Sequence, residues 1–261
     1  MIARQLIAPA LAIVTTVLSS SLHGADGPPG KTRAKSWALP VTKVAAVSNS
    51  FSRDIDEASR TIPPHVWQVV LEAGWRVSLV EYVVEAVPSL RGMSPRGWPA
   101  GLKWDNTDAV HLPNSKLLII AEKRRNKQGQ IVACTRTSGV LRHEVGHAFD
   151  VLSGETNRFQ SAGQSFLNAY NADYFRMNPT RRQELGYYLQ RGRAGHEETF
   201  AEAFGIIFGG GSDTAHREAF TSAFPRTIEC VRQAVAAAAS KSRRVAVTPA
   251  RQKSAIVQIK P

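Results

Sequence analysis

The spacing His143-Glu144-x-x-His147 places two imidazoles and a carboxylate where they can act together. On an α-helix, residues four apart lie on one face, so the two histidines can bind the same metal ion. Glu144 would lie beside that ion without binding it, where it can take a proton from water that the metal activates. The pattern therefore predicts a zinc site that supports hydrolysis.

The residues around this motif favour the helix that it requires. Apolar side chains recur at helical spacing and would bury the side that flanks the histidines. They are Val140, Leu141, Val145, Ala148, Phe149 and Leu152. Ser138 is expected to cap the N-terminus of this helix, and Gly154 stands where a terminating glycine is expected.

A third metal ligand must come from elsewhere in the chain, because catalytic zinc takes three protein ligands and a water. A histidine six residues after His147 would define the metzincin class, but that residue is Ser153. Residues 197–208 have the pattern of a second helix and carry Glu198 and Glu202 one turn apart. We therefore expect a glutamate as the third ligand.

The two glutamates of this second helix can take different roles. We assign Glu198 as the metal ligand and Glu202 as the carboxylate that accepts the second N–H of a ligating histidine. The reverse assignment is the main alternative, and Glu197 and His196 are further candidates for the ligand. Asp150 is also expected to orient a ligand without binding the metal.

Two stretches of the sequence resemble the catalytic domain of anthrax lethal factor and its smaller secreted relatives, the Pro-Pro endopeptidases. They are His-Glu-Val-Gly-His-Ala-Phe-Asp at 143–150 and Glu-Thr-Phe-Ala-Glu-Ala-Phe at 198–204. A loop upstream, Pro-Arg-Gly-Trp at 95–98 through Trp-Asp at 104–105, is similar to a stretch of the same family. The resemblance covers residues 61–235.

The resemblance implies a zincin-like metallopeptidase of the gluzincin class, with one zinc ion per chain. It supports Glu198 as the ligand that joins His143 and His147. It also implies that an extended peptide substrate lies along a strand at the edge of the sheet. The residues expected to form that strand are Leu117, Leu118, Ile119, Ile120 and Ala121.

The family also has a tyrosine seven residues before the ligand glutamate, where its hydroxyl stabilises the oxyanion. In this chain that position is Arg191. We expect Tyr188 to supply the hydroxyl, with Tyr187, Arg191 or His196 as alternative donors. A site without any donor is a further alternative and would make a slow enzyme.

The first 25 residues have the layout of a secretory signal peptide. Arg4 precedes an apolar run at residues 6–18, and small residues follow at Gly24 and Ala25. We therefore expect secretion, or export to the periplasm or cell envelope, with a retained N-terminal anchor as the alternative. Residues 26–60 are polar and mixed in charge, and we expect them to form a linker or loosely ordered arm.

The formal net charge of +12 is concentrated near the C-terminus. Residues 240–261 contain no acidic residue and are expected to form a basic, flexible tail attracted to anionic surfaces. Its basic residues are Lys241, Arg243, Arg244, Arg251, Lys253 and Lys260. The charge does not gather on one predicted folded face, so no specific nucleic-acid partner is expected.

Between these ends, residues 61–239 are expected to form one domain. Segments rich in β-branched and aromatic residues predict strands at 75–84, 116–122 and 131–134. Helices are expected at 63–74, after Ser138, at 178–192, at 197–208, and after Asp213 and Pro225. Strands followed by helices indicate an α+β fold: a small N-terminal sheet part, then a mostly helical part that carries the active-site helix.

Together these patterns predict a secreted, zinc-dependent endopeptidase with Glu144 as general base, acting as a monomer on a peptide or protein. A zinc-binding secreted domain without hydrolytic activity is one alternative, and a basic protein that binds anionic surfaces is another. The two cysteines, Cys134 and Cys230, would form one disulfide in an oxidising compartment or remain as two buried thiols.

Overall fold

The computed structural model describes residues 41–43, 47–95, 100–152 and 159–247. The predicted signal peptide, most of the predicted arm and the last fourteen residues, 248–261, lie outside this part of the chain. All described residues belong to one compact unit. No helix among the described residues is long and apolar enough to cross a membrane.

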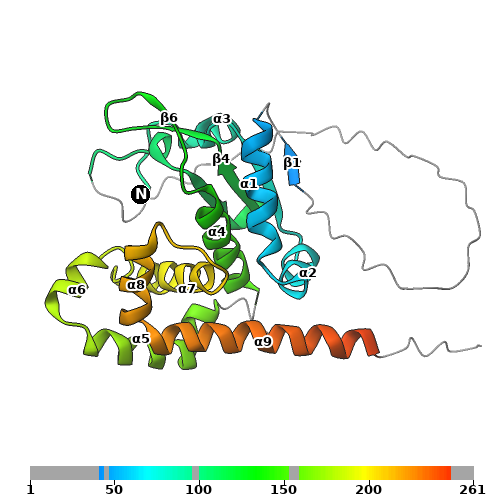
Figure 1. Cartoon of the computed structure of the whole chain (residues 1–261), viewed down its shortest axis with the longest axis vertical. Coiled ribbons are helices and arrows are strands. Elements are labelled where there is room, and N and C mark those ends of the chain that lie inside the picture. The colour runs from blue at the N-terminus through cyan, green and yellow to red at the C-terminus, as the bar shows by residue number, and fades with distance from the viewer. Residues whose placement is uncertain (1–40, 44–46, 96–99, 153–158, 248–261) are drawn as a thin grey trace, which may run out of the picture. The chain divides into compact units, whose positions relative to one another are not determined.

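A four-stranded sheet forms the first part of the fold (Figure 1). Its strands lie in the order β1 (Val41–Lys43), β2 (Arg76–Val80), β4 (Leu117–Ala121) and β3 (Ala109–Leu112). The first three are parallel, and β3 is antiparallel to β4. The predicted strand at 75–84 is shorter than expected, because its last residues form the short helix α3 (Val83–Ala86).

The strand expected at the edge of the sheet, β4, lies in its interior, so that prediction is wrong. β2 pairs with one side of β4 and β3 with the other, where Val110 is opposite Ile119. An unbroken apolar run such as Leu117–Ala121 is typical of a strand with neighbours on both sides. Within the described residues, β3 is the outer strand on this side of the sheet.

A small hairpin follows the sheet. It consists of β5 (Lys123–Arg125) and β6 (Ile131–Ala133), which pair antiparallel. The turn between the two strands lies between Asn126 and Gly129, where the Gly129 N–H donates to the Asn126 carbonyl. Short 3-10 helices occur at Pro88–Leu90, Trp104–Asn106, Pro113–Ser115 and Gln160–Ala162.

The predicted arm at 26–60 contains an ordered helix, which corrects the expected start of the domain. α1 (Asn49–Arg60) begins where the Ser48 hydroxyl accepts a hydrogen bond from the Phe51 N–H, and it packs against the central helix α4. Phe51 and Ile55 are buried on its inner face. The mean composition of this segment is polar, but its apolar residues lie on one face, which is sufficient for a packed helix. α2 (Pro64–Glu72) follows as predicted.

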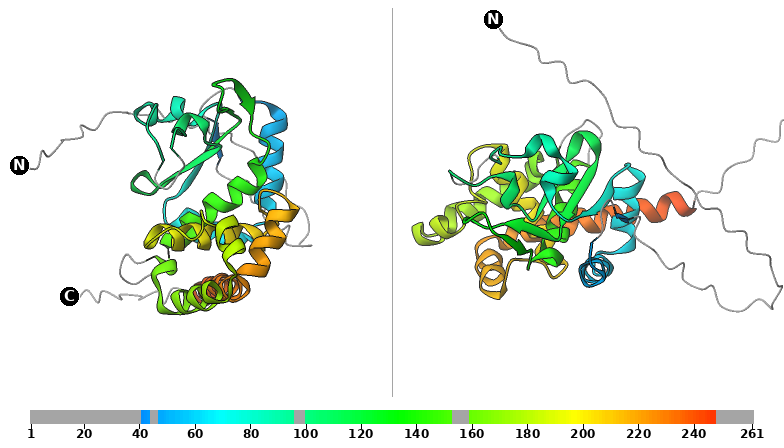
Figure 2. Two further views of the ribbon diagram at one scale, coloured as in Figure 1. Left: turned by 90° about the vertical axis from the view of Figure 1, so that its left-hand side faces the viewer. Right: turned by 90° about the horizontal axis from the view of Figure 1, so that it is seen from above.

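The helix α4 (Thr137–Val151) carries the His-Glu-x-x-His motif and lies between the sheet and the later helices (Figures 1 and 2). Its N-cap is Arg136 and not the predicted Ser138, and Arg136 makes no side-chain capping bond. The predicted terminating Gly154 lies outside the described residues. α4 packs most extensively against α7 (Arg193–Ile207), the second predicted motif helix.

Four more helices complete the described part of the fold, and the longest of them packs against α7. They are α5 (Gln164–Arg176), α6 (Pro179–Glu184), α8 (Thr214–Ala223) and α9 (Pro225–Val247). Asn178 and Asp213 cap α6 and α8 as expected, but α6 ends well before Gly192. α9 continues beyond residue 239, so the predicted flexible tail begins as a helix. The fold is α+β, as predicted, with a small sheet followed by a mostly helical part.

Candidate metal centre and active site

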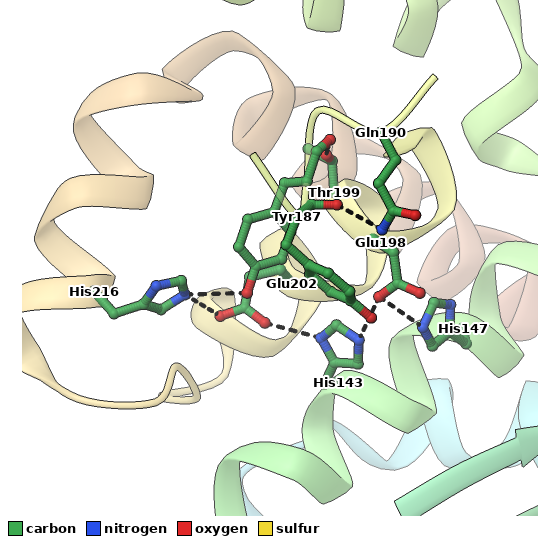
Figure 3. A network of polar contacts seen from close by, with 9 residues as sticks. His143, His147, Tyr187, Gln190, Glu198, Thr199, Glu202 and His216 are labelled. Atoms are coloured by element: carbon green, nitrogen blue, oxygen red, sulfur yellow. Dashed lines mark hydrogen bonds and ion pairs between the residues drawn. The ribbon is translucent and has the colours of Figure 1, made fainter. Parts of the chain in front are cut away.

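Three side chains from the two motif helices converge on one point (Figure 3). His143 and His147 come from α4, Glu198 comes from α7, and one ligand atom of each lies within 4.8 Å of the others. Glu198 Oε2 lies 3.2 Å from His143 Nε2 and 3.5 Å from His147 Nε2. The structure thus brings together the three residues expected to bind the metal.

A close approach of the two helix backbones makes this convergence possible. A Cβ atom on Gly146 would lie 2.8 Å from the Cα atom of Ala201, so a larger residue would push α7 away. Gly205 of α7 likewise lies against the backbone of His143. Because the ligands are on facing sides of these helices, the glycine contacts set the distance between the histidines and the glutamate.

The donor set fits a zinc ion. Two imidazole nitrogens and one carboxylate oxygen are the ligands of many catalytic zinc sites, which leave a fourth position open for water. The other ring nitrogen of His143, Nδ1, lies 2.8 Å from Glu202 Oε2. A carboxylate on that nitrogen holds the ring so that Nε2 faces the metal position.

Glu202 is the centre of a wider polar network. Its second oxygen, Oε1, lies 2.7 Å from Nε2 of His216 on α8. The hydroxyl of Tyr188 lies 3.3 Å from the same nitrogen. His216 was not identified from the sequence, because a single histidine three residues after a helix cap carries no motif. Its place at this site depends on how α8 packs.

The electrostatics of the cluster favour the binding of a cation. Burial alone would raise the pKa of Glu198, but His147 and His143 outweigh burial and hold this pKa below its ordinary range. Burial also opposes ionisation of Glu202, yet hydrogen bonds with His143 and His216 lower its pKa to about 2. Both carboxylates are therefore ionised at neutral pH, as a site for a cation requires.

Glu144 lies in a cavity of about 370 Å³ that also contains His143 and Tyr187. Burial raises the pKa of Glu144 above its ordinary value, although the neighbouring histidines oppose the shift. A carboxylate whose pKa is raised toward neutrality is a better proton acceptor at that pH. The motif glutamate is thus beside the ligands and open to the space that a substrate would enter.

The two adjacent tyrosines have different surroundings. In Figure 3 the side chain of Tyr187 points toward His143 and Glu198, and Tyr187 lines the cavity with Glu144. Tyr188, the expected oxyanion donor, also borders the cavity, but its hydroxyl contacts His216 and burial raises its pKa. The backbone oxygen of Tyr188 accepts a hydrogen bond from the Thr199 hydroxyl, at 2.8 Å, which fixes this turn against α7.

The other two candidate donors lie elsewhere. His196 packs edge-on against Tyr170, with ring centroids 4.7 Å apart, and so faces α5. Arg191 is exposed and does not line the cavity that contains Glu144. Of the four residues considered from the sequence, only the tyrosines border this cavity, and Tyr187 is the one directed at the metal ligands.

The hydrogen bonds of Asp150 differ from the expected ones. Its carboxylate is fully buried and accepts from the backbone N–H of Ser161 at 2.7 Å and from the Ser161 hydroxyl at 2.6 Å. These bonds fasten the segment after α4 to the helix. Both carboxylate oxygens of Asp150 are used for this anchor. Its hydrogen bonds therefore do not support the expected role in orienting a metal ligand.

A further histidine, His111 of β3, forms one wall of the site. Its ring stacks between Trp75, at a centroid distance of 5.0 Å, and His147, at 5.2 Å. Burial and the neighbouring histidines lower its pKa to about 3, so the ring is neutral at physiological pH. Sequence reasoning missed it because the short strand β3 has no clear pattern.

The two cysteines are free thiols, which removes the disulfide alternative. Cys134 is buried at the end of the hairpin, where burial and Asp108 raise its pKa. Cys230 lies on α9. The fold therefore depends on packing and not on a covalent link between these positions.

The α+β fold, with two motif histidines and a glutamate from a second helix, defines a metallopeptidase centre of the zincin type. The chain belongs to the anthrax toxin lethal factor family: the family described as "Anthrax toxin lethal factor, N- and C-terminal domain" matches residues 35–233. The comparison with curated proteins found no match.

A solved structure has the same fold. The Pro-Pro endopeptidase PPEP-2 from Paenibacillus alvei aligns with a TM-score of 0.51 and 21% sequence identity. The alignment covers 74% of this chain and 96% of that one. The shared fold therefore extends over nearly the whole of the solved protein, and this chain has additional residues.

Proposed function

We propose that this protein is a secreted endopeptidase that uses one zinc ion held by His143, His147 and Glu198. The observation that carries the proposal is the convergence of these three donors, one of which, His143, lines a cavity together with Glu144. Membership in the lethal factor family supports the same class of reaction. When bound, zinc would activate water and polarise the carbonyl group of the scissile bond.

Glu144 acts as the general base in this proposal. It takes a proton from the attacking water and returns it to the nitrogen of the leaving amine. The raised pKa of Glu144 brings its proton affinity closer to that needed at neutral pH. Glu202 meanwhile holds His143 through Nδ1, so the base and the ligand keep their relative position.

Tyr187 is the proposed oxyanion donor, in place of Tyr188. A phenolic hydroxyl directed into the cavity can donate a hydrogen bond to the carbonyl oxygen as negative charge develops. Tyr187 is part exposed and points toward the ligands, whereas the hydroxyl of Tyr188 is engaged by His216. The two residues are neighbours in the chain, but the turn that contains them sends their side chains in different directions.

The substrate backbone would pair with β3 in place of the originally expected β4. β3 is the outer strand, packs against α4 and begins at Ala109, which lines the cavity with Glu144. An extended peptide added to this strand would satisfy unpaired main-chain groups and pass the metal ligands. The scissile bond would then be fixed by hydrogen bonds that do not depend on its side chains.

Export by residues 1–25 remains part of the proposal, supported by the apolar run after Arg4. Fractionation of the producing cells and N-terminal sequencing of the mature protein test it. The basic residues near the C-terminus would add attraction to an anionic surface. Their deletion should weaken binding to anionic vesicles without changing peptide hydrolysis.

The test of the activity combines metal content with hydrolysis. Purified protein should contain about one zinc per chain, and His143→Ala should lose it. Metal-loaded protein should cleave members of a peptide library, whereas Glu144→Gln should keep zinc and lose cleavage. Zinc binding without cleavage of any peptide would identify a metal-binding domain, and a chain that takes up no zinc would contradict the proposal.

A further inference from the structure

The cavity beside Glu144 contains an arginine that the proposed reaction does not use. Arg136, the N-cap of α4, lines this cavity together with His143 and Glu144. Its side chain is 51% exposed. An arginine that faces substrate space with free N–H groups can recognise a carboxylate.

The ion pairs around Arg136 leave it available. Its nearest described acidic partner is Asp108, at 3.5 Å from the guanidinium. Asp108 has a closer partner in Arg124 of the hairpin, at 2.7 Å, and is itself almost buried. The three groups together carry one net positive charge. Asp108 is thus compensated by Arg124, and Arg136 retains donors for a further anion.

The acidic residues of the cavity do not compensate Arg136 either. Glu202 is engaged by His143 and His216. Glu144 lines the cavity beside His143, where the proposed zinc ion would supply positive charge. Among the described residues that line the cavity, Arg136 is the sole arginine or lysine. The cavity wall near the start of α4 therefore carries a positive charge that no described acidic residue of the cavity neutralises.

The position of Arg136 relates it to the scissile bond. Arg136 precedes Glu144 by eight positions, which corresponds to about 12 Å along a helix at about 1.5 Å per residue. An extended peptide advances about 3.3 Å per residue, so about four residues span that distance. A substrate side chain within about four residues of the scissile bond can therefore reach the guanidinium.

We propose that Arg136 selects substrates that carry a carboxylate, from an aspartate or glutamate side chain, close to the scissile bond. This inference rests on the proposed peptidase activity and names its substrate class. The C-terminal carboxylate of a peptide has the same chemistry. An endopeptidase acts within a chain, however, and therefore meets the side chain more often than the terminus.

The experiment compares matched peptides with the metal-loaded enzyme. A library-derived substrate with an amidated C-terminus is made with glutamate or glutamine at each of about four positions on either side of the scissile bond. At one of them, kcat/KM should be about tenfold higher for glutamate, and salt should reduce this ratio. Arg136→Gln should bring the ratio to about one, and Arg136→Glu should favour lysine instead.

Arg125→Gln is the matched control for a change in net charge. Arg125 is exposed on the hairpin, its guanidinium bonds the carbonyl of Gly129, and it does not line the cavity. It should keep the ratio of the unchanged enzyme. Asp108 keeps its partner Arg124 in Arg136→Gln, so this variant should still fold.

The outcomes separate the two proposals. Cleavage without any preference for glutamate overturns the role of Arg136 and leaves the peptidase activity intact. An equal loss of preference in Arg136→Gln and Arg125→Gln does the same. If the glutamine peptide with a free C-terminal carboxylate is cleaved faster than its amidated form, and glutamate gives no preference, the recognised carboxylate is the terminus and the side-chain proposal is overturned. Failure of the metal-loaded enzyme to cleave any library peptide overturns both proposals.

Discussion

Gly146 of α4 and Ala201 of α7 lie so close that a Cβ atom on the glycine would be 2.8 Å from the Cα atom and 2.8 Å from the carbonyl oxygen of the alanine. The backbones themselves are in contact at this crossing. His143 and Glu198 lie three residues before this contact on their helices, and His147 directly follows Gly146. The contact therefore links the packing of the core to the geometry of the site.

Replacement of Gly146 by alanine should disturb both the packing of the core and the geometry of the metal site. The added methyl group meets backbone, which cannot rotate away, so overpacking should cost about 1–3 kcal/mol. For a chain of this size, that corresponds to a Tm lowered by about 2–4 °C per kcal/mol. Because α7 must move, chelator competition should also show weaker zinc binding.

Gly92→Ala is a useful comparison for that variant. Nothing lies within 4 Å of a Cβ at Gly92, but its φ of +72° is unfavourable for alanine. It should lower the Tm through backbone strain and leave zinc affinity unchanged. Full zinc affinity in Gly146→Ala would contradict the proposed link between this helix contact and the metal site.

The network behind His143 should control metal affinity. Glu202→Gln removes the ionised acceptor on His143 Nδ1, and His216→Ala removes one donor to that carboxylate. Loss of such partners typically weakens metal binding by about 10–100-fold. We expect a larger effect for Glu202→Gln, measured by competition with a fluorescent zinc chelator. Glu218→Gln, an exposed change on α8, should have no effect.

Replacement of each tyrosine by phenylalanine should have a different effect on steady-state kinetics. Tyr187→Phe should lower kcat by about 100-fold while KM and zinc content change little, because the hydroxyl would act on the developing oxyanion. Tyr188→Phe should retain most of kcat, since its hydroxyl contacts His216. The reverse order of effects would restore Tyr188 as the donor.

Asp150 should make the stability of the metal-free protein depend on pH. Burial raises its pKa from 3.8 to about 7, so the folded protein holds this proton more tightly than the unfolded chain. As the pH rises from about 4 to about 7, the unfolded chain loses this proton before the folded protein does, and the free energy of unfolding therefore falls progressively. The slope for one proton is at most about 1.4 kcal/mol per pH unit.

The Asp150→Asn variant should remove this contribution. Asparagine can accept from the Ser161 N–H and donate to the Ser161 hydroxyl, so the anchor is preserved without the buried charge. Urea unfolding between pH 4 and 7 should show a smaller decline in stability than in the unchanged protein. Asp56→Asn on the exposed face of α1 is the control. Identical slopes in all three proteins would show that Asp150 does not titrate in this range.

The sequence by itself determined the features that depend on local spacing. His143 and His147 had to share a face because they are four residues apart on a helix. The spacing of Glu198 and Glu202 indicated a second helix that carries the third ligand, and the family resemblance favoured Glu198. Caps such as Asn178 and Asp213 also follow from local hydrogen bonds between a side chain and the next turn. These relations involve a few consecutive residues, so they are readable without the fold.

Only the tertiary structure decided the features that depend on distant partners. β4 is interior because β3, a short strand with no clear pattern, pairs with its free side. The different directions of Tyr187 and Tyr188 arise from a turn held by Thr199, eleven residues later. His111, His216 and Arg136 join the site through the packing of separate elements. Such positions are set by long-range contacts, which residue type and spacing do not encode.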